Sequence, residues 1–198
     1  GSAGDAGHVR IYEWDGSAWS QKGTDIDGEA SGDFSGWSVS MPNENTVAIG
    51  ATGNDGSANN SGQVRIYTWN GTSWVQKGGD IDGEAANDGS GTSVSMPNEN
   101  TVSIGAYSNA GNGNYSGQVR IYSWDANSSS WSQIFTDIDG ENTGDFSGYS
   151  VSMPNAKIVA IGAPRSSPTT SNQGHVRVFK LCSHTTASIT PSVCDSYN

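Results

Sequence analysis

The chain has 198 residues, of which 27 are Gly and only 33% are hydrophobic, a composition that favours many short strands and turns over helices. Nine Lys and Arg oppose 20 Asp and Glu, so a net charge of −11 argues against nucleic acid as a partner and against direct insertion into a membrane. Because the chain lacks an apolar run of about 18 residues and a basic segment followed by an apolar one at its start, we expect neither a membrane span nor an intact signal peptide.

The first strand candidates in chain order are residues 9–14 and 18–22. They correspond to the third and fourth strands of a repeating unit whose complete form follows. That unit contains four short alternating runs bounded by Gly, Asn, Asp or Pro, which is typical of antiparallel β structure. The runs of the first complete unit span residues 37–41, 46–51, 64–69 and 73–77. The Asn70-Gly71 pair between the last two predicts a tight hairpin, because both residues tolerate positive φ.

The repeat itself is the main signal in the sequence. A six-residue block occurs at 7–12, 62–67, 117–122 and 174–179, at spacings of 55, 55 and 57 residues. We therefore divide the chain into units of about 7–29, 30–84, 85–141 and 142–181, followed by a Ser- and Thr-rich tail or linker over 182–198. The last unit is expected to have three strands, at 151–153, 158–163 and 176–181, which brings the predicted total to 13.

Large side chains on both faces of the third strand decide between possible folds. Val64 and Ile66 face one way, whereas Arg65, Tyr67 and Trp69 face the other, so each sheet needs cover on both sides. Four-stranded sheets stacked face to face satisfy that need. The sequence therefore predicts an all-β, propeller-like array of about three and a quarter blades over residues 1–181, with a linear β-solenoid as the alternative.

Two short elements of the unit resemble the FG-GAP repeat, which carries an aromatic-Gly element before its first strand and a Gly-Ala-Pro element after its second. The first element occurs as Asp33-Phe34-Ser35-Gly36 and again at 145–148, whereas the middle copy, Asp88-Gly89-Ser90-Gly91, lacks the aromatic residue. The second element occurs at 49–51, 104–106 and 161–164. The resemblance implies a seven-bladed propeller of secreted or cell-surface proteins that acts in adhesion and often binds calcium.

Acidic residues gather in three equivalent windows that hold 12 of the 20 carboxylates. In each window they occupy relative positions 1, 3, 5 and 9, a spacing similar to that of oxygen-ligand calcium loops. The candidate calcium ligands are Asp25, Asp27, Glu29, Asp33, Asp80, Asp82, Glu84, Asp88, Asp137, Asp139, Glu141 and Asp145. The alternative is that these carboxylates cap turns, because the Gly position differs and no Glu closes the loop. Both interpretations stay open on the sequence.

Other repeated side chains have structural interpretations. Arg10, Arg65, Arg120 and Arg177 recur in the third strand and are expected to pair with acids of a neighbouring blade. Trp residues recur at both sides of the following turn, where we expect packing between blades or, alternatively, a rim that stacks on sugars. Cys182 and Cys194 in the tail predict a disulfide, with two free thiols as the alternative.

These features favour a non-catalytic extracellular recognition or adhesion module that binds a protein or a glycan through loops of the propeller. Catalysis normally needs one asymmetric constellation, whereas every polar feature here recurs in near-equivalent settings. The alternative is a structural subunit that associates with itself, because 13 strands leave sheet edges uncovered. A carbohydrate-active enzyme with a carboxylate pair is the third possibility.

Overall fold

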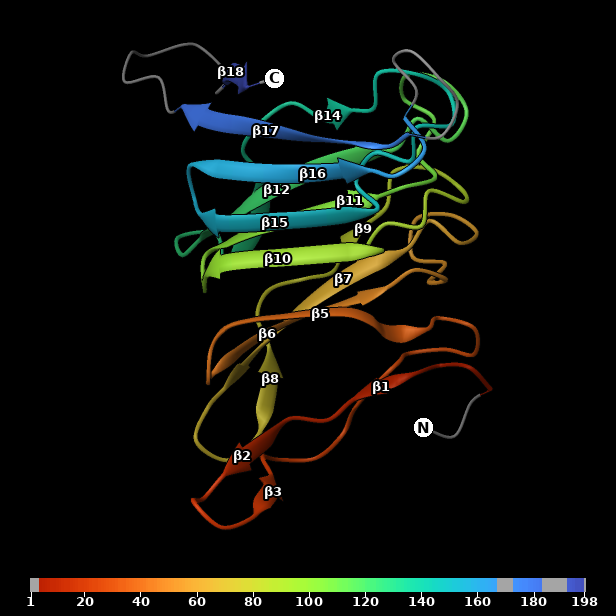
Figure 1. Ribbon diagram of the computed structural model, residues 1–198. Coiled ribbons are helices and arrows are strands. Elements are labelled where there is room, and N and C mark those ends of the chain that lie inside the picture. Colours follow the sequence, from red (N-terminus) through yellow and green to blue (C-terminus); the bar gives the residue numbers. More distant parts are fainter. Residues whose placement is uncertain (1–3, 167–172, 183–191, 198) are drawn as a thin grey trace.

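The computed structural model describes residues 4–166, 173–182 and 192–197. Within these ranges every regular element is a β-strand, and the strands form antiparallel sheets that follow one another along the molecule (Figure 1). The described part of the chain has no helix that is long and apolar enough to cross a membrane. The predicted all-β, propeller-like fold is confirmed.

The first complete sheet contains residues 35–82. Its strands are β5 (Ser35–Asn43), β6 (Thr46–Ala51), β7 (Gln63–Trp69), β8 (Trp74–Gln76) and the two-residue β9 (Ile81–Asp82). The order is β5-β6-β7-β8, and β9 pairs with the start of β7 next to β8. The strand expected over 46–51 matches β6, and the other three differ from the expected bounds by at most two residues at either end.

The same topology returns in the next two sheets. The second sheet contains β10 (Ser93–Asn98), β11 (Thr101–Ala106), β12 (Gln118–Asp125), β13 (Ser130–Gln133) and β14 (Ile138–Asp139); the third contains β15 (Ser150–Asn155), β16 (Ile158–Ala163), β17 (His175–Cys182) and β18 (Ser192–Tyr197). Strand β18 lies in the segment expected to be a linker, where it pairs with β17 as a fourth strand. The side chains of Cys182 and Cys194, and with them the disulfide prediction, lie outside the described part.

The N-terminal unit has only the outer part of a sheet. Strands β2 (Tyr12–Trp14) and β3 (Trp19–Gln21) form a hairpin, and β1 (His8–Val9) pairs with β4 (Ile26–Asp27). The β2–β3 pair corresponds to β7–β8 of the complete sheet, and the β1–β4 pair corresponds to β7–β9. The two-residue strands β4, β9 and β14 were not expected from the sequence, because a pair of residues is too short to show an alternating pattern.

The first strands β5, β10 and β15 run side by side, so that successive units meet along them (Figure 1). The Ser38 hydroxyl donates to the Gly91 carbonyl at 2.7 Å, and the Ser40 hydroxyl accepts from the backbone N–H of Met96 at 3.0 Å. A Cβ on Gly50 would lie 2.1 Å from the Gly91 oxygen, so only Gly permits this approach of the two backbones. This contact gives a physical reason for Gly in the Ile-Gly-Ala element.

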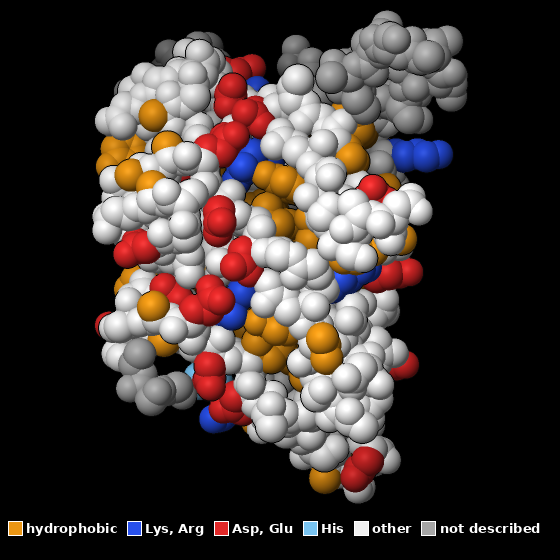
Figure 2. All heavy atoms as spheres, turned by 180° about the vertical axis from the view of Figure 1, so that it is seen from behind, with side chains coloured by type: hydrophobic (Ala, Val, Ile, Leu, Met, Phe, Trp, Pro, Cys, Tyr) orange, Lys and Arg blue, Asp and Glu red, His pale blue; other side chains and the backbone are white. Residues whose placement is uncertain are grey.

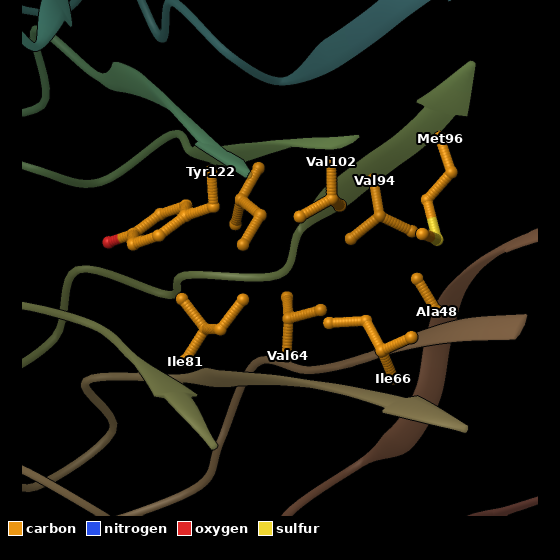
Figure 3. Packing of buried hydrophobic residues seen from close by; sticks show 9 residues of the cluster. Ala48, Val64, Ile66, Ile81, Val94, Met96, Val102 and Tyr122 are labelled. Atoms are coloured by element: carbon orange, nitrogen blue, oxygen red, sulfur yellow. The ribbon is translucent and has the colours of Figure 1, made fainter. Parts of the chain in front are cut away.

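A hydrophobic core fills the space between consecutive sheets. Between the first two complete sheets it contains Ala48, Val64, Ile66 and Ile81 on one side and Val94, Met96, Val102, Ile104 and Tyr122 on the other, all buried. Figure 3 shows these two sets of side chains pointing toward one another. On the opposite side of the first sheet, Val47 and Ile49 pack against Ile11 and Ile26. Both faces of the sheet are therefore covered, as the alternation along the third strand predicts.

Candidate functional site

Each acidic window contains one of the two-residue strands and the loop that follows it. Its last acid is buried, with only 3% of Asp33, Asp88 or Asp145 exposed. One carboxylate oxygen of each accepts the backbone N–H of the residue three positions earlier, at 2.8, 3.0 and 2.9 Å respectively. These are the contacts of turn-capping carboxylates.

The middle of each window faces an Arg of the next unit. The carboxylates of Glu29, Glu84 and Glu141 lie 3.6, 3.8 and 3.8 Å from the guanidinium groups of Arg65, Arg120 and Arg177. The same guanidinium groups donate to the backbone carbonyls of Asp27, Asp82 and Asp139 at 2.8, 2.7 and 2.6 Å. Acidic and basic side chains accordingly alternate in a column along one face of the molecule (Figure 2). The predicted pairing of Arg with a neighbouring unit is confirmed for these three.

Arg10 is the exception, because its partner is the first acid of its own window. Its guanidinium donates three hydrogen bonds to Asp25, at 3.0, 2.9 and 2.8 Å, and together with a bond from Gln21 these lower the pKa of Asp25 to about 2. In the later windows the Gln equivalent to Gln21 makes the same contact with the first acid. Gln76 donates to Asp80, and Gln133 to Asp137, at 2.6 Å in each case.

Asp82 and Asp139 are the second acids of their windows, and both have a raised pKa. Burial is the largest cause, and the neighbouring carboxylates of Asp80 and Asp137 add to it. One oxygen of Asp139 is buried without a hydrogen-bond partner. A charged carboxylate is therefore unfavourable at these two positions.

The twelve predicted calcium ligands thus have several different partners. Among the described residues, no three His, Cys, Asp or Glu side chains gather as a group that could hold a metal ion. The contacts found at Asp33, Asp88 and Asp145 favour turn capping for these three acids. Calcium binding and turn capping stay the two interpretations of the windows, and a calcium titration distinguishes them.

The repeated Trp residues join consecutive units. The indole N–H of Trp74 donates to the Lys22 carbonyl, and that of Trp131 to the Lys77 carbonyl, both at 2.8 Å. Each Lys ammonium lies 5.0 to 5.9 Å from the centres of the two rings that it faces. At the next junction Ile134 and Leu181 replace the Lys and a Trp, and they pack in an apolar cluster. The prediction of packing between units therefore holds for these Trp residues, while Trp14 and Trp19 are 53% and 67% exposed.

A groove of about 850 Å³ lies where the loops of the first two complete sheets meet. These loops, β6–β7 and β11–β12, lie on the same side of the stack of sheets, at the ends of the strands (Figure 1). Phe34 and Trp37 line one part of the groove, and Tyr107 and Tyr115 line another. Phe34, Trp37 and Tyr115 are 44%, 60% and 45% exposed, so aromatic surface faces solvent here.

The groove lies where the middle unit departs from its neighbours. Gly89 and Thr92 stand at the positions of Phe34 and Trp37 in the unit before, and of Phe146 and Tyr149 in the unit after. A Cβ on Gly89 would lie 3.4 Å from the Tyr107 ring, in ordinary contact, so a larger side chain there would point toward the groove. The two smaller residues therefore leave space that aromatic rings occupy in the other copies.

The aromatic residues around the groove hold one another in place. Tyr107 contacts Phe146 and Tyr149 at ring-centre distances of 5.7 and 5.8 Å, and Tyr115 contacts Phe146 at 5.5 Å. Phe34 and Trp37 form an edge-on pair at 6.2 Å. Such pairs add about 0.5–1.5 kcal/mol beyond burial, so the rings are fixed in position before any ligand arrives.

Several of these residues adopt a strained backbone. Phe34, Tyr115 and Phe146 have φ values of 54°, 57° and 57°, in the left-handed region that non-Gly residues enter at a cost of about 1–3 kcal/mol. Gly89 has a φ of 62° and occupies the same conformation without that cost. Aromatic side chains are thus present at positions where the backbone alone favours Gly.

The sequence did not single out Phe34, Trp37, Tyr107 or Tyr115 as site residues. The one sequence feature that pointed to this site was the absence of the aromatic residue from the middle copy. In the sequence, that absence is only a departure from the repeat pattern. Because the groove combines loops from two units, its existence required the spatial relation of segments more than 70 residues apart, such as Phe34 and Tyr107. Chemically, the site offers flat apolar faces together with amide and carboxylate groups.

Comparison with known proteins identifies one family. The model of the FG-GAP repeat matches residues 19–67, which run from β3 through β7, while no match was found among curated proteins. FG-GAP repeats are typical of extracellular or surface proteins and generally serve as non-enzymatic structural modules. The segment from Trp19 to Tyr67 therefore matches the FG-GAP repeat family.

Proposed function

We propose that the chain is a non-catalytic recognition module of a secreted or cell-surface protein, and that its ligand binds in the groove between the first two complete sheets. The observation that carries this proposal is the groove itself, lined by exposed aromatic side chains where the repeat pattern is broken. An exposed aromatic surface next to a concave site is a common mark of ligand binding.

The strained aromatic positions support the same function. Phe34 has a left-handed backbone conformation, and its ring is exposed. The little apolar surface that it buries therefore offsets only part of the free-energy cost of that conformation. A residue that stability alone does not favour is best explained by a contact that it makes with a partner. Strain of this kind tends to gather at binding sites.

The carboxylates of the groove support recognition rather than catalysis. Asp88 accepts hydrogen bonds from the Ala85 N–H and the Asn109 amide, both at 3.0 Å, and is buried. Glu84 accepts from the Gln118 amide at 3.0 Å and faces Arg120. Both acids therefore have protein partners that already occupy them.

A binding assay against immobilised extracellular proteins and glycans tests the proposal. We expect the wild-type chain to bind at least one class of probe and the Trp37→Ala and Tyr107→Ala variants to lose most of that binding. Val75→Ala is the control, because Val75 is an exposed apolar residue that lies outside the groove and outside the Trp14–Trp19 pair. Equal binding by the groove variants and the control would refute the proposal.

A second candidate function, self-association, is supported by Trp14 and Trp19. Their rings meet at 5.4 Å and 54°, almost the geometry of Trp69 and Trp74 at 5.5 Å and 56°. Whereas Lys22 of the preceding unit covers the second pair, the first pair is exposed. Light scattering of wild type and of a Trp14→Ala variant tests this function, and a wild-type mass that stays monomeric at all concentrations would contradict it.

A further inference from the structure

We infer that the groove takes a neutral oligosaccharide, an inference that rests on the proposed recognition function and names its ligand class. The groove is about 850 Å³, in the upper part of the range of about 300–1,000 Å³ that is usual for small-molecule sites. It therefore has room for a ligand longer than a single small ring. Its two aromatic regions come from different units, which suits a ligand that extends from one to the other.

The aromatic rings match the apolar side of a sugar. A pyranose has a face of C–H groups that packs on a flat ring, and Tyr or Trp can also hydrogen-bond at its polar edge. Trp37 is 60% exposed and leans on Phe34, while Tyr107 is held by Phe146 and Tyr149. Each region of the groove thus presents a ring whose orientation is already fixed by an aromatic neighbour.

The polar groups of the groove match the hydroxyls of a sugar. The exposed side chains of Asn87 and Asn114 both line it, and an amide offers donors and an acceptor together, as a pair of hydroxyls requires. Behind them, Asn109 donates to Asp88 at 3.0 Å and accepts the Gly111 N–H at 2.8 Å. These hydrogen bonds hold the buried part of the groove lining in place, so that the exposed amides of Asn87 and Asn114 lie on a rigid surface.

The charge of the groove selects among sugars. Glu84 and Asp88 line it, and none of the described residues lining it is Lys, Arg or His. The whole chain also carries a net charge of −11. An acidic sugar or a sulfated chain would meet like charge without a cationic partner, so the preferred ligand carries no negative charge.

The decisive variant is Gly89→Phe, which gives the middle unit the residue of its neighbours. Phe34 and Phe146 show that the same backbone conformation accepts a Phe, with φ values of 54° and 57° against 62° at Gly89. The added ring would enter the groove beside Tyr107. Gly89→Asn is the matched control, because Asn also tolerates positive φ but is too short to fill the groove. Circular dichroism and thermal melting establish that each variant is folded.

Wild type and variants are screened against neutral, acidic and sulfated oligosaccharides, and each hit is titrated by calorimetry. We expect binding to a neutral oligosaccharide that Gly89→Phe and Trp37→Ala weaken by about tenfold or more, as the loss of about 1.4 kcal/mol implies, while Gly89→Asn binds like wild type. Preference for acidic glycans, or unchanged binding by folded Gly89→Phe, would overturn the inference.

Two further outcomes separate this inference from the proposed function. Binding only to protein probes, insensitive to periodate oxidation of any attached glycan but lost in Gly89→Phe, would overturn the sugar ligand and leave the recognition function standing. Absence of binding to every protein and glycan probe by the folded wild-type chain would overturn both.

Discussion

Gly78 permits the Trp contacts that join two units, and replacing it by Ala should destabilise the fold for two separate reasons. Its φ is +79°, and an added Cβ would lie 2.6 Å from a carbon of the Trp124 ring. The left-handed conformation costs a non-Gly residue about 1–2 kcal/mol. Forcing the ring to move adds about 1–3 kcal/mol, as is usual for overpacking. We expect the free energy of unfolding to fall by about 2–5 kcal/mol.

A double-mutant cycle with Trp124→Leu separates the two costs. The next junction already shows the alternative, because there Leu181 takes the place of the Trp and Phe135 that of the Gly. Removing the large ring should relieve the clash in Gly78→Ala, so we expect a favourable coupling of about 1–3 kcal/mol. The cost that remains in the double variant is then that of the backbone and of the contact with Trp131, whose ring carbon would lie 3.1 Å from the added Cβ.

Gly71→Ala is the matched control. Gly71 also has a positive φ, of +99°, but a Cβ there would meet no atom within 4 Å. It should cost about 1–2 kcal/mol and show no coupling to Trp124→Leu. Urea unfolding followed by far-UV circular dichroism measures all variants without depending on Trp fluorescence. A cost at Gly78 no larger than that at Gly71, or strict additivity with Trp124→Leu, would refute the steric explanation.

Three more predictions follow from the repeated contacts. Lys22→Met should lower the free energy of unfolding, measured in urea, by about 1.5–3 kcal/mol, because the Lys22 ammonium donates to the Glu44 carbonyl at 2.9 Å and to the Asn45 side chain at 3.0 Å. Lys180→Met serves as the control, because Lys180 is exposed. Equal losses of stability in the two variants would contradict the prediction. Burial raises the pKa of Asp139 above 3.8, so its carboxyl group holds a proton more tightly in the folded state than in the unfolded state. The Asp139→Asn variant should therefore be more stable than wild type at pH 7, and this difference in unfolding free energy should shrink as the pH falls through the folded-state pKa. A difference that stays constant with pH would refute this cause. Millimolar calcium should leave the melting temperature unchanged, because Asp33 and its equivalents already accept backbone N–H groups; a calcium-dependent rise, abolished by Asp88→Asn, would instead establish the calcium interpretation.

Much of the fold follows from local sequence pattern. The strand expected over 46–51 coincides with β6, because its length, its apolar residues and the turns that bound it all act over a few residues. The hairpin at Asn70-Gly71 and the pairing of Arg65 with a neighbouring unit were also predicted correctly, although the loop spans residues 70–73 and of the pair only Gly71 has a positive φ. Repetition strengthened these expectations, because a local pattern that recurs in several units rarely arises by chance.

Only the tertiary structure assigned partners to the acidic windows. The spacing of Asp25, Asp27, Glu29 and Asp33 allows a metal loop or a capped turn, and the chain direction alone does not show which side chain turns inward. In the fold Asp33 is buried against its own loop, Glu29 faces Arg65 and Asp25 binds Arg10. These contacts depend on neighbouring strands and units, which local spacing does not describe.

The groove shows the same division most clearly. The sequence by itself determined that Gly89 interrupts an otherwise aromatic position, and it determined the repeating strands that carry the loops. Only the packing of one unit on the next brought Phe34 and Trp37 to the same groove as Tyr107 and Tyr115, and placed Gly89 in the lining of that groove. The physical reason is that periodicity specifies each unit from within, whereas a site between units depends on how their surfaces fit together.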